Sequence, residues 1–399
     1  MTRFAGNIKI SLFSLLLVAL LGFFPSSAVA EESIQKTHDS SQTSSGIYAP
    51  VEAHVVGYYT EEEGHLPSSF SSFTENMENM TILAPFWFRL NQYDCTDIES
   101  TDGFDETEAH NLVTIAHDNN VCVLPVIHNF LYDDKSLTQD LVTEMLSSPV
   151  SRNNCISNIV NLIKYYNFDG VNMDFEGIRQ SDKDNLSLFY SELGDRLRTE
   201  GYTFSVAIPA KENDSHNPWA TPYDYDSIGE AADLVMLMMY NEHGFPGSGS
   251  GPVSSIGFNN SVIDYAVDRI APHKIILAEP VFGFDFNLQT GRYTYLSHEM
   301  AMERLENYDA RVHFDLTSLT PFFSYTDALE QGHEVWYEDK LSLLHKLDLI
   351  SRHSLGGLAM WRLGMEDPEA WQAIQEKVIF KHNPGKETTE KTGEPPEEQ

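Results

Sequence analysis

Short apolar segments alternate with longer amphipathic segments through the middle of the chain, and this alternation limits the folds that the chain can adopt. The apolar segments lie at residues 53–59, 81–88, 121–127, 170–175, 203–208, 234–240, 275–284 and 357–361. Near-continuous runs of Val, Ile, Leu and Met are typical of parallel strands that are buried on both faces. Eight strand–helix units over about 320 residues predict an α/β protein with a (β/α)₈ TIM barrel. A doubly wound open sheet is the alternative, because periodicity alone does not prove that a sheet closes.

The connections between these apolar segments differ in length and in pattern. Residues 106–119, 150–166 and 182–200 have helical periodicity. The connection between the seventh and eighth segments is much longer, at about seventy residues, and it mixes a helical pattern with short alternating segments. We therefore expect a small α+β insertion between strands 7 and 8, at about residues 287–345. Because barrel active sites lie at the carboxyl ends of the strands, this insertion would form one wall of that face.

The two ends of the chain lack this alternation. Arg3 and Lys9 accompany an apolar stretch from Ile10 to Phe24, and Ala28-Val29-Ala30 follows it; this is the pattern of a cleaved secretory signal peptide. A retained membrane anchor is the alternative, since the apolar stretch nears a spanning length; we expect cleavage, secretion and no stable membrane anchor afterwards. The predicted divisions are a signal peptide at 1–30, a low-complexity leader at 31–50, the barrel at 51–380 and a disordered polar tail at 381–399.

The chain is strongly acidic, with 60 Asp and Glu residues against 25 Lys and Arg residues and a formal charge of −35. Such a surface repels the phosphate groups of nucleic acids, so nucleic acid is not an expected partner, whereas neutral glycans remain open. The three cysteines, Cys95, Cys122 and Cys155, allow at most one intramolecular disulfide. No Cys/His cluster has metal-ligand spacing, and we expect neither a metal site nor a cofactor.

One apolar segment carries polar residues at every second position. Asn172, Asp174 and Glu176 share one face of the predicted fourth strand, because side chains alternate along a strand. In a closed barrel this face points inward, where buried polar groups are unfavourable. Repulsion between two nearby acids raises the proton affinity of one of them, so a protonated Glu176 could act as a general acid near neutral pH. An acidic strand end on a solvated face is the simpler alternative.

The segment Asp169-Gly170-x-Asn172-x-Asp174-x-Glu176 resembles the signature of family-18 glycoside hydrolases, the chitinase superfamily, which fold as (β/α)₈ barrels. The chain is most similar to the branch that contains bacterial spore-cortex-lytic N-acetylglucosaminidases and related germination proteins. Further segments that resemble this family follow in the expected order, at residues 84–88, 125–130, 238–243, 251–257, 280–285, 335–339 and 361–367. The resemblance runs from about residue 51 to residue 374.

This resemblance implies roles for four residues. Glu176 would protonate the leaving oxygen and later activate water, and Asp174 would hold the N-acetyl group of the substrate. The carbonyl oxygen of that group would attack the anomeric carbon, so the intermediate would be an oxazolinium ion and the configuration would be retained. Tyr240 would donate a hydrogen bond to the acetamido oxygen. Trp361 would form an apolar floor beneath the same sugar.

The remaining predicted substrate-binding residues are Asn172, Asn241, His128, Asn129 and Trp87. Asn172 and Asn241 stand where many family members carry Asp, and Phe282 stands where Tyr is usual, so rate and specificity stay open. Simpler interpretations also stay open, with the aromatic residues as core side chains and His128-Asn129 as part of a local turn.

The leading functional hypothesis is a secreted, retaining β-N-acetylglucosaminidase that acts on peptidoglycan, with spore cortex as one candidate form. Its partner would be a polysaccharide that contains N-acetylglucosamine, and its location would be extracellular, in the cell wall or the spore envelope. A chitinase that acts on chitin oligomers is the second hypothesis. A non-catalytic, chitinase-like sugar-binding protein is the third, although such proteins usually lack the acid that stands here as Glu176. The oligomeric state stays unknown at this stage.

Overall fold

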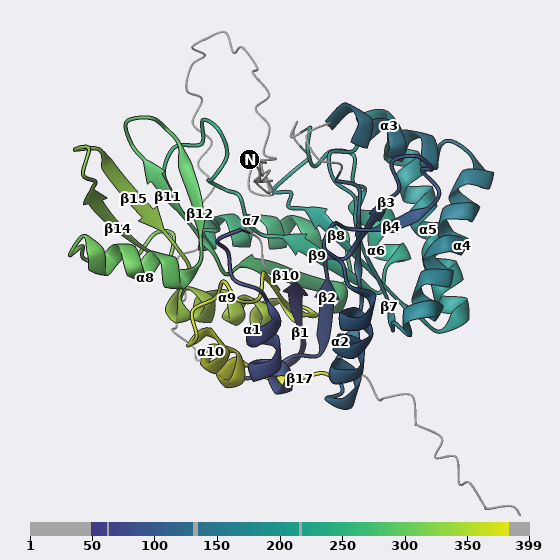
Figure 1. Cartoon of the computed structure of the whole chain (residues 1–399), viewed down its shortest axis with the longest axis horizontal. Coiled ribbons are helices and arrows are strands. Elements are labelled where there is room, and N and C mark those ends of the chain that lie inside the picture. The colour runs from purple at the N-terminus through teal and green to yellow at the C-terminus, as the bar shows by residue number, and fades with distance from the viewer. Residues whose placement is uncertain (1–48, 62–63, 131–134, 215–217, 383–399) are drawn as a thin grey trace, which may run out of the picture.

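The computed structural model describes residues 49–61, 64–130, 135–214 and 218–382. The predicted signal peptide lies outside the described residues, as do all but two residues each of the predicted leader and the predicted polar tail. Within the described residues the chain forms a barrel and an attached antiparallel sheet (Figure 1).

The barrel wall consists of eight strands, two of which are interrupted. The strands are β1 (Val51–Tyr59), β2 (Ile82–Pro85) continued by β3 (Phe88–Leu90), β5 (Cys122–Val123) continued by β6 (Val126–His128), β7 (Gly170–Asp174), β8 (Thr203–Pro209), β9 (Leu234–Met238), β10 (Ile275–Pro280) and β16 (Gly357–Trp361). Parallel hydrogen-bonded pairs join each strand to the next and join β16 back to β1. The ring is therefore closed, which confirms the predicted (β/α)₈ barrel and excludes the open sheet.

Two short strands extend this wall. β4 (Ile98–Ser100) pairs antiparallel with β3. β17 (Val378–Phe380) pairs parallel with the start of β1. The last strand of the described chain thus lies beside the first.

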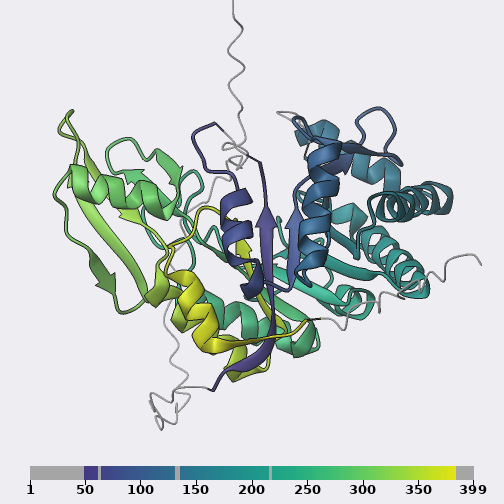
Figure 2. The ribbon, with the colours of Figure 1, turned by 60° about the horizontal axis from the view of Figure 1, so that its bottom comes forward.

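Helices cover the outside of the barrel (Figure 2). They are α1 (Phe70–Asn76), α2 (Glu106–Asp118), α3 (Lys135–Leu146), α4 (Pro149–Tyr166), α5 (Lys183–Glu200), α6 (Tyr225–Ala231), α7 (Ile256–Val267), α9 (Lys340–His353) and α10 (Ala370–Lys377), with 3₁₀ turns η1 (Met77–Asn79), η2 (Gln180–Asp182) and η3 (Pro272–Lys274). Helix α2 begins where Asp105 accepts hydrogen bonds from the backbone of Thr107 and Glu108, and α9 begins with a capping box of Asp339 and Ser342. The three predicted helices agree with α2, α4 and α5 to within one residue.

Alternate strand residues form two cores. The inner core fills the barrel and contains Val56, Tyr58, Ile82, Ala84, Phe86, Leu124, Val126, Ala207, Leu234, Met236, Ile276, Ala278 and Ala359. The outer core lies between the wall and the helices and takes the intervening residues, such as Val55, Val171 and Leu358. Two fully buried polar residues, Asn172 and Ser205, also belong to the strands, and the Asn172 amide donates to Ser205 Oγ at 2.9 Å. None of the helices in the described part of the chain combines the length and the apolar composition that a membrane crossing requires.

An antiparallel sheet is inserted between β10 and α9. Its elements are β11 (Gly283–Asn287), β12 (Tyr293–Leu296), α8 (His298–Asn307), β13 (His313–Asp315), β14 (Thr320–Thr326) and β15 (Gly332–Trp336). The spatial order of the strands is β12-β11-β15-β14-β13. Helix α8 packs on the sheet around Ala301, Phe323 and Val335, and the unit stands beside the barrel (Figure 1). The predicted α+β insertion is confirmed.

The bounds expected for this insertion, about residues 287–345, need correction. The seventh apolar segment is not one strand, because β10 ends at Pro280 and β11, which starts at Gly283, already belongs to the inserted sheet. The inserted sheet ends at Trp336, and α9 begins at Lys340. Both β10 and β11 are buried, so hydrophobicity alone did not separate them.

Candidate active site

The acidic strand β7 brings two acids to the carboxyl-terminal mouth of the barrel. β7 ends at Asp174, and Glu176 follows two residues later. Val171, Met173 and Phe175 belong to the outer core, whereas the Asn172 amide contacts Ser205 and Met236 Sδ across the interior. This alternation directs Asp174 and Glu176 to the barrel interior, as the sequence pattern predicts.

Burial and the charge of Asp174 raise the proton affinity of Glu176. Burial raises the pKa of Asp174. Burial and the charge of Asp174 raise the pKa of Glu176 well above its ordinary range, and a hydrogen bond from the Trp219 side chain opposes this rise. Burial and the neighbouring negative charge both favour the protonated form of Glu176, which makes Glu176 the candidate general acid of the pair. Such a pair can supply one acid and one anion to the same substrate.

Two aromatic residues complete the mouth. Tyr240 follows β9, and its ring centroid lies 6.1 Å from that of Phe282. Burial is the main cause that raises the pKa of Tyr240, and the neighbouring Tyr58, Asp174 and Glu176 add to it, so its hydroxyl stays a hydrogen-bond donor.

Trp361 is the last residue of β16 and is partly exposed. Its ring meets Tyr58 and Phe86 edge to face, at centroid distances of 5.2 and 5.6 Å. Tyr58 lies close to Asp174. Burial is the main cause that raises the pKa of Tyr58, and the charge of Asp174 raises it further. The structure therefore brings Asp174, Glu176, Tyr240 and Trp361 together at one mouth.

His128 is a neutral hydrogen-bond donor inside the barrel. Its ring is fully buried and stacks on Phe86 at a centroid distance of 4.2 Å. Burial and the charge of Arg89 lower the pKa of His128 to about 3. Its Nδ1 accepts from the backbone of Phe130 at 3.1 Å, so the ring proton resides on Nε2. Within the described residues, neither His128 Nε2 nor Asp174 Oδ1 has a hydrogen-bond partner. Unpaired buried polar atoms are unfavourable, and a polar ligand that reached these two atoms could pair with them.

Asn129, Asn241 and Trp87 occupy three different situations. Asn129 is buried and bonds to the backbone of Glu176. Asn241 follows Tyr240, is partly exposed and has a left-handed backbone with φ of 64°. Trp87 is 4% exposed and packs in the outer core against Phe104, so the structure does not bring it to the site.

Phe86 and Trp87 belong to different cores. Phe86 points into the barrel and Trp87, the next residue, points out toward the helices. The position of Trp87 agrees with the simpler interpretation of the aromatic residues as core side chains, and Phe86 is the inward aromatic at this strand.

Sequence reasoning also missed Tyr58 and Trp219. Tyr58 follows Val56 at period two in the first apolar segment, and this spacing could have placed it inside the barrel. Trp219 lies in the connection between β8 and α6, where no periodic pattern marks it. Its ring lies 3.5 Å from the position that a Cβ atom of Gly177 would occupy.

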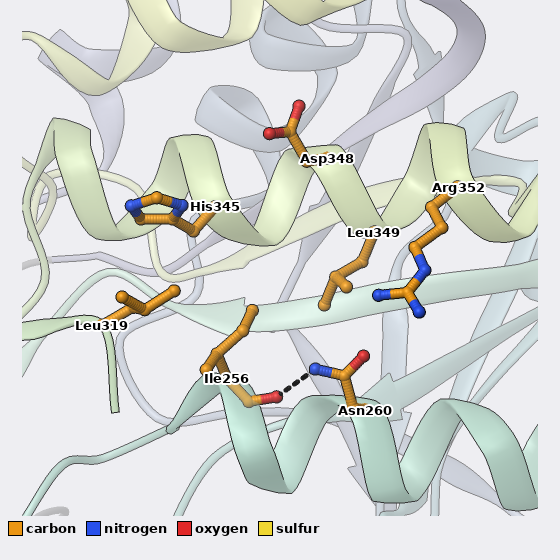
Figure 3. Close-up of a pocket in the computed structure, with 7 residues that line it drawn as sticks. All are labelled: Ile256, Asn260, Leu319, His345, Asp348, Leu349 and Arg352. Carbon is orange, nitrogen blue, oxygen red and sulfur yellow. Dashed lines mark hydrogen bonds between the residues drawn. The ribbon is translucent and has the colours of Figure 1, made fainter. Parts of the chain in front are cut away.

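Two further observations concern the described chain outside this mouth. Among the described residues, no group of three His, Cys, Asp or Glu side chains is placed to hold a metal ion. A separate depression of about 160 Å³ lies outside the barrel between α7 and α9 (Figure 3). It is lined by Ile256, Asn260, Leu319, His345, Asp348, Leu349 and Arg352. It contains none of the predicted site residues, and we assign it no role.

A closed (β/α)₈ barrel with a buried acid pair at the end of its fourth strand defines the class of barrel proteins that are built like glycoside hydrolases. The chain belongs to the glycosyl hydrolases family 18, whose sequence pattern matches residues 54–366. This match confirms the family that the resemblance of the acidic strand implied.

Two similar proteins come from Bacillus subtilis (strain 168). The chain is 33% identical over 227 residues to a Bacillus subtilis (strain 168) glycosylase, YdhD, whose name assigns it to sporulation; the match covers 56% of this chain and 54% of that protein. It is 30% identical over 275 residues to the cortical fragment-lytic enzyme of Bacillus subtilis (strain 168), covering 67% of this chain and 62% of that protein. The chain thus spans less than two thirds of the length of each of these relatives.

A solved structure has the same fold. The crystal structure of the spore cortex-lytic enzyme SleL of Bacillus megaterium QM B1551 matches with a TM-score of 0.75 and 28% identity. The match covers 84% of this chain and 76% of that chain. It extends the family likeness over most of the described barrel.

Proposed function

We propose that the protein is a secreted, retaining glycoside hydrolase that cleaves β-N-acetylglucosaminyl linkages in peptidoglycan. The observation that carries this proposal is the buried pair of Asp174 and Glu176 at the strand ends, in which the pKa of Glu176 is raised the further. The relatives named for lysis of spore cortex direct us to peptidoglycan among the polymers that contain N-acetylglucosamine. Its location would be extracellular, in the cell wall or the spore envelope.

The proposed reaction has two steps. In the first, Glu176 gives its proton to the leaving oxygen while the acetamido carbonyl oxygen of the substrate attacks the anomeric carbon, which forms an oxazolinium ion. Asp174 is the anion that holds and polarises the acetamido group, and Tyr240 donates to its oxygen. In the second step Glu176 takes a proton from water, which opens the oxazolinium with retained configuration. Trp361 supports the apolar face of the sugar.

The decisive experiment compares three polymers. Spore cortex, vegetative peptidoglycan and chitin are each digested with the wild-type protein and with Glu176→Gln, and the fragments are analysed by mass spectrometry. We expect new N-acetylglucosamine reducing ends from peptidoglycan with the wild type and at least a hundredfold fewer with the variant, on the order of the loss of a general acid.

A matched control separates loss of the acid from loss of the fold. Glu192→Gln changes a glutamate on α5 that pairs with Arg152 at 2.7 Å, away from the mouth, and should keep wild-type activity. Products from chitin alone would replace our proposal with the chitinase hypothesis. If wild type and Glu176→Gln were equally inactive on all three polymers while both bound them, the protein would be a sugar-binding relative.

A further inference from the structure

The backbone just beyond strand β7 is held by side chains instead of by a neighbouring strand. β7 ends at Asp174, and the next three residues lie beyond the parallel ladder. Each of their carbonyl oxygens accepts a side-chain hydrogen bond: Phe175 O from Tyr223 Oη at 2.6 Å, Glu176 O from Asn129 Nδ2 at 2.8 Å, and Gly177 O from Gln139 Nε2 at 2.6 Å. We call Asn129, Gln139 and Tyr223 the backbone clamp.

The side chain of Asn129 takes the place of the neighbouring strand β6, which ends at His128. Its Oδ1 accepts from the backbone N–H of Glu176 at 2.9 Å, while its Nδ2 donates to the carbonyl of the same residue at 2.8 Å. Glu176 thus makes both of its backbone hydrogen bonds with the side-chain amide of Asn129. A residue in an antiparallel strand pair exchanges the same two bonds with the residue opposite. The register supports this, because His128, the residue before Asn129, is the last of β6 and pairs with Asp174.

The other two clamp residues approach from different sides. Tyr223 is fully buried and lies just before α6, whereas Gln139 is partly exposed and lies on α3. Gly177 has φ of +65°, in the left-handed region, and the ring of Trp219 covers the position where a Cβ atom would lie. The turn after Glu176 is therefore fixed by hydrogen bonds and packing from two connections of the barrel, the one between β6 and β7 and the one between β8 and β9.

We propose that Asn129, Gln139 and Tyr223 are positioning residues that fix the Glu176 carboxyl against the leaving oxygen, a role that rests on the proposed function. None of the three needs to touch the substrate. A general acid must lie within hydrogen-bond reach of the oxygen that it protonates, and a misplacement of about 1 Å lowers the rate on the order of 100-fold. The clamp supplies this accuracy at a site where the regular sheet has already ended.

The first test uses two clamp variants and a matched control. Asn129→Ala removes both bonds to Glu176, and Gln139→Met removes one bond at a partly exposed helical position, which protects the test if the buried variant fails to fold. Asn158→Ala is the control, because Asn158 also donates its amide to a distant backbone carbonyl, Thr96 O at 2.9 Å, but on the outer helix α4.

The measurement is kcat/KM on two β-glycosides of one N-acetylglucosamine oligomer. One glycoside has 4-nitrophenol as its leaving group, and the other has a further sugar. For the sugar leaving group we expect a loss on the order of 100-fold for Asn129→Ala and about tenfold for Gln139→Met. Both losses should be much smaller for 4-nitrophenol, because a good leaving group needs little protonation. Equal losses on the two glycosides, or values equal to those of Asn158→Ala, would overturn the proposal.

The second test asks whether Asn129 acts through Glu176. In the Glu176→Gln background, Asn129→Ala should cause no further loss on the sugar glycoside, since the group that it positions is already gone. A further loss as large as that seen in the wild-type background would overturn the proposal. A wild type that does not differ from Glu176→Gln would instead defeat the proposed function, and the clamp with it.

Discussion

At the scale of the residue, the proton on Glu176 links the chemistry to the stability of the fold. Burial and the charge of Asp174 raise the pKa of Glu176, so the folded protein binds this proton more tightly than the unfolded chain does. Above the ordinary pKa of a glutamate the unfolded chain has lost the proton. The folded state then loses stability as the pH rises toward the raised pKa.

Glu176→Gln should therefore stabilise the protein increasingly as the pH rises. We expect variant and wild type to have similar unfolding free energies near pH 4, with the variant gaining about 1.4 kcal/mol for each pH unit between the unfolded and the folded pKa of Glu176. Thermal unfolding from acid to alkaline pH measures this difference. A difference that stayed constant with pH for Glu176→Gln would contradict the raised pKa of Glu176.

Trp219 should tune the pH dependence of activity. Its hydrogen bond to the Glu176 carboxyl lowers the pKa of Glu176 relative to what burial and Asp174 impose. Trp219→Phe removes this donor, so the pKa of Glu176 should rise and the alkaline limb of the kcat/KM profile should move to higher pH. Trp371→Phe is a matched control, because Trp371, which lies on α10, also donates its indole N–H to a glutamate, Glu366, at 3.2 Å. A limb that moved equally in both variants, or toward lower pH in Trp219→Phe, would refute this role.

How far single residues could be predicted depended on periodicity. The two-residue alternation was sufficient for Asp174, which ends the regular strand β7, and it also fitted Glu176, two residues beyond the strand. The same alternation separates the inward Phe86 from Trp87, which packs in the outer core. Trp219 could not be found this way, since its place depends on the path of a loop rather than on a repeat.

At the scale of the element, a buried ionic cluster joins the barrel to the insertion. Lys346 on α9 is 2% exposed, and its Nζ lies 2.8 Å from Glu338 and 3.4 Å from Glu279. Ser254 Oγ donates to Glu279 at 3.1 Å. Burial raises the pKa of Glu279 to about 7, against the opposing effect of Lys346. One lysine therefore stabilises two acids, one on β10 and one at the end of the insertion.

Lys346→Met should strongly destabilise the protein. The variant leaves two buried carboxylates without their cation, and breaking a buried ion pair in this way costs about 3–5 kcal/mol. Denaturant unfolding at neutral pH measures the loss. Lys377→Met is the control, because Lys377 pairs with Asp348 nearer the surface, at 2.5 Å, where such pairs contribute about 1 kcal/mol or less. Similar losses of unfolding free energy for the two variants would show that the buried cluster stabilises the fold no more than a surface ion pair does.

Elements were predictable where their period and their ends were both marked. Helix α2 has an apolar period and an Asp105 cap, and its predicted end was one residue from the observed one. β10 and β11 are both buried and only two residues apart, so no turn signal separated them in the sequence. Their separation follows from pairing with different partners, β16 and β15, which is a tertiary property.

At the scale of the whole molecule, the charge of −35 should shape the encounter with a polymer. An anionic glycan is repelled at low salt, and this repulsion is screened as the Debye length falls from about 10 Å at 0.1 M to about 3 Å at 1 M. We expect kcat/KM on an anionic wall polymer to rise with salt, and kcat/KM on a neutral N-acetylglucosamine oligomer to change little. Equal salt dependence on the two substrates would show that the charge of the protein does not repel the anionic polymer.

The pairing of β17 with β1 brings the two ends of the described barrel together. Val378 is in register with Val51, and the backbone of Lys381 donates to Ala53 O at 3.0 Å. This pair lies where β1 begins, on the side of the wall opposite to the mouth formed by the strand ends. A module joined to either end would be attached at the face of the barrel opposite to the mouth, and would leave the mouth accessible to the polymer. A short linker between the two ends would also allow circular permutation without a change in the catalytic face.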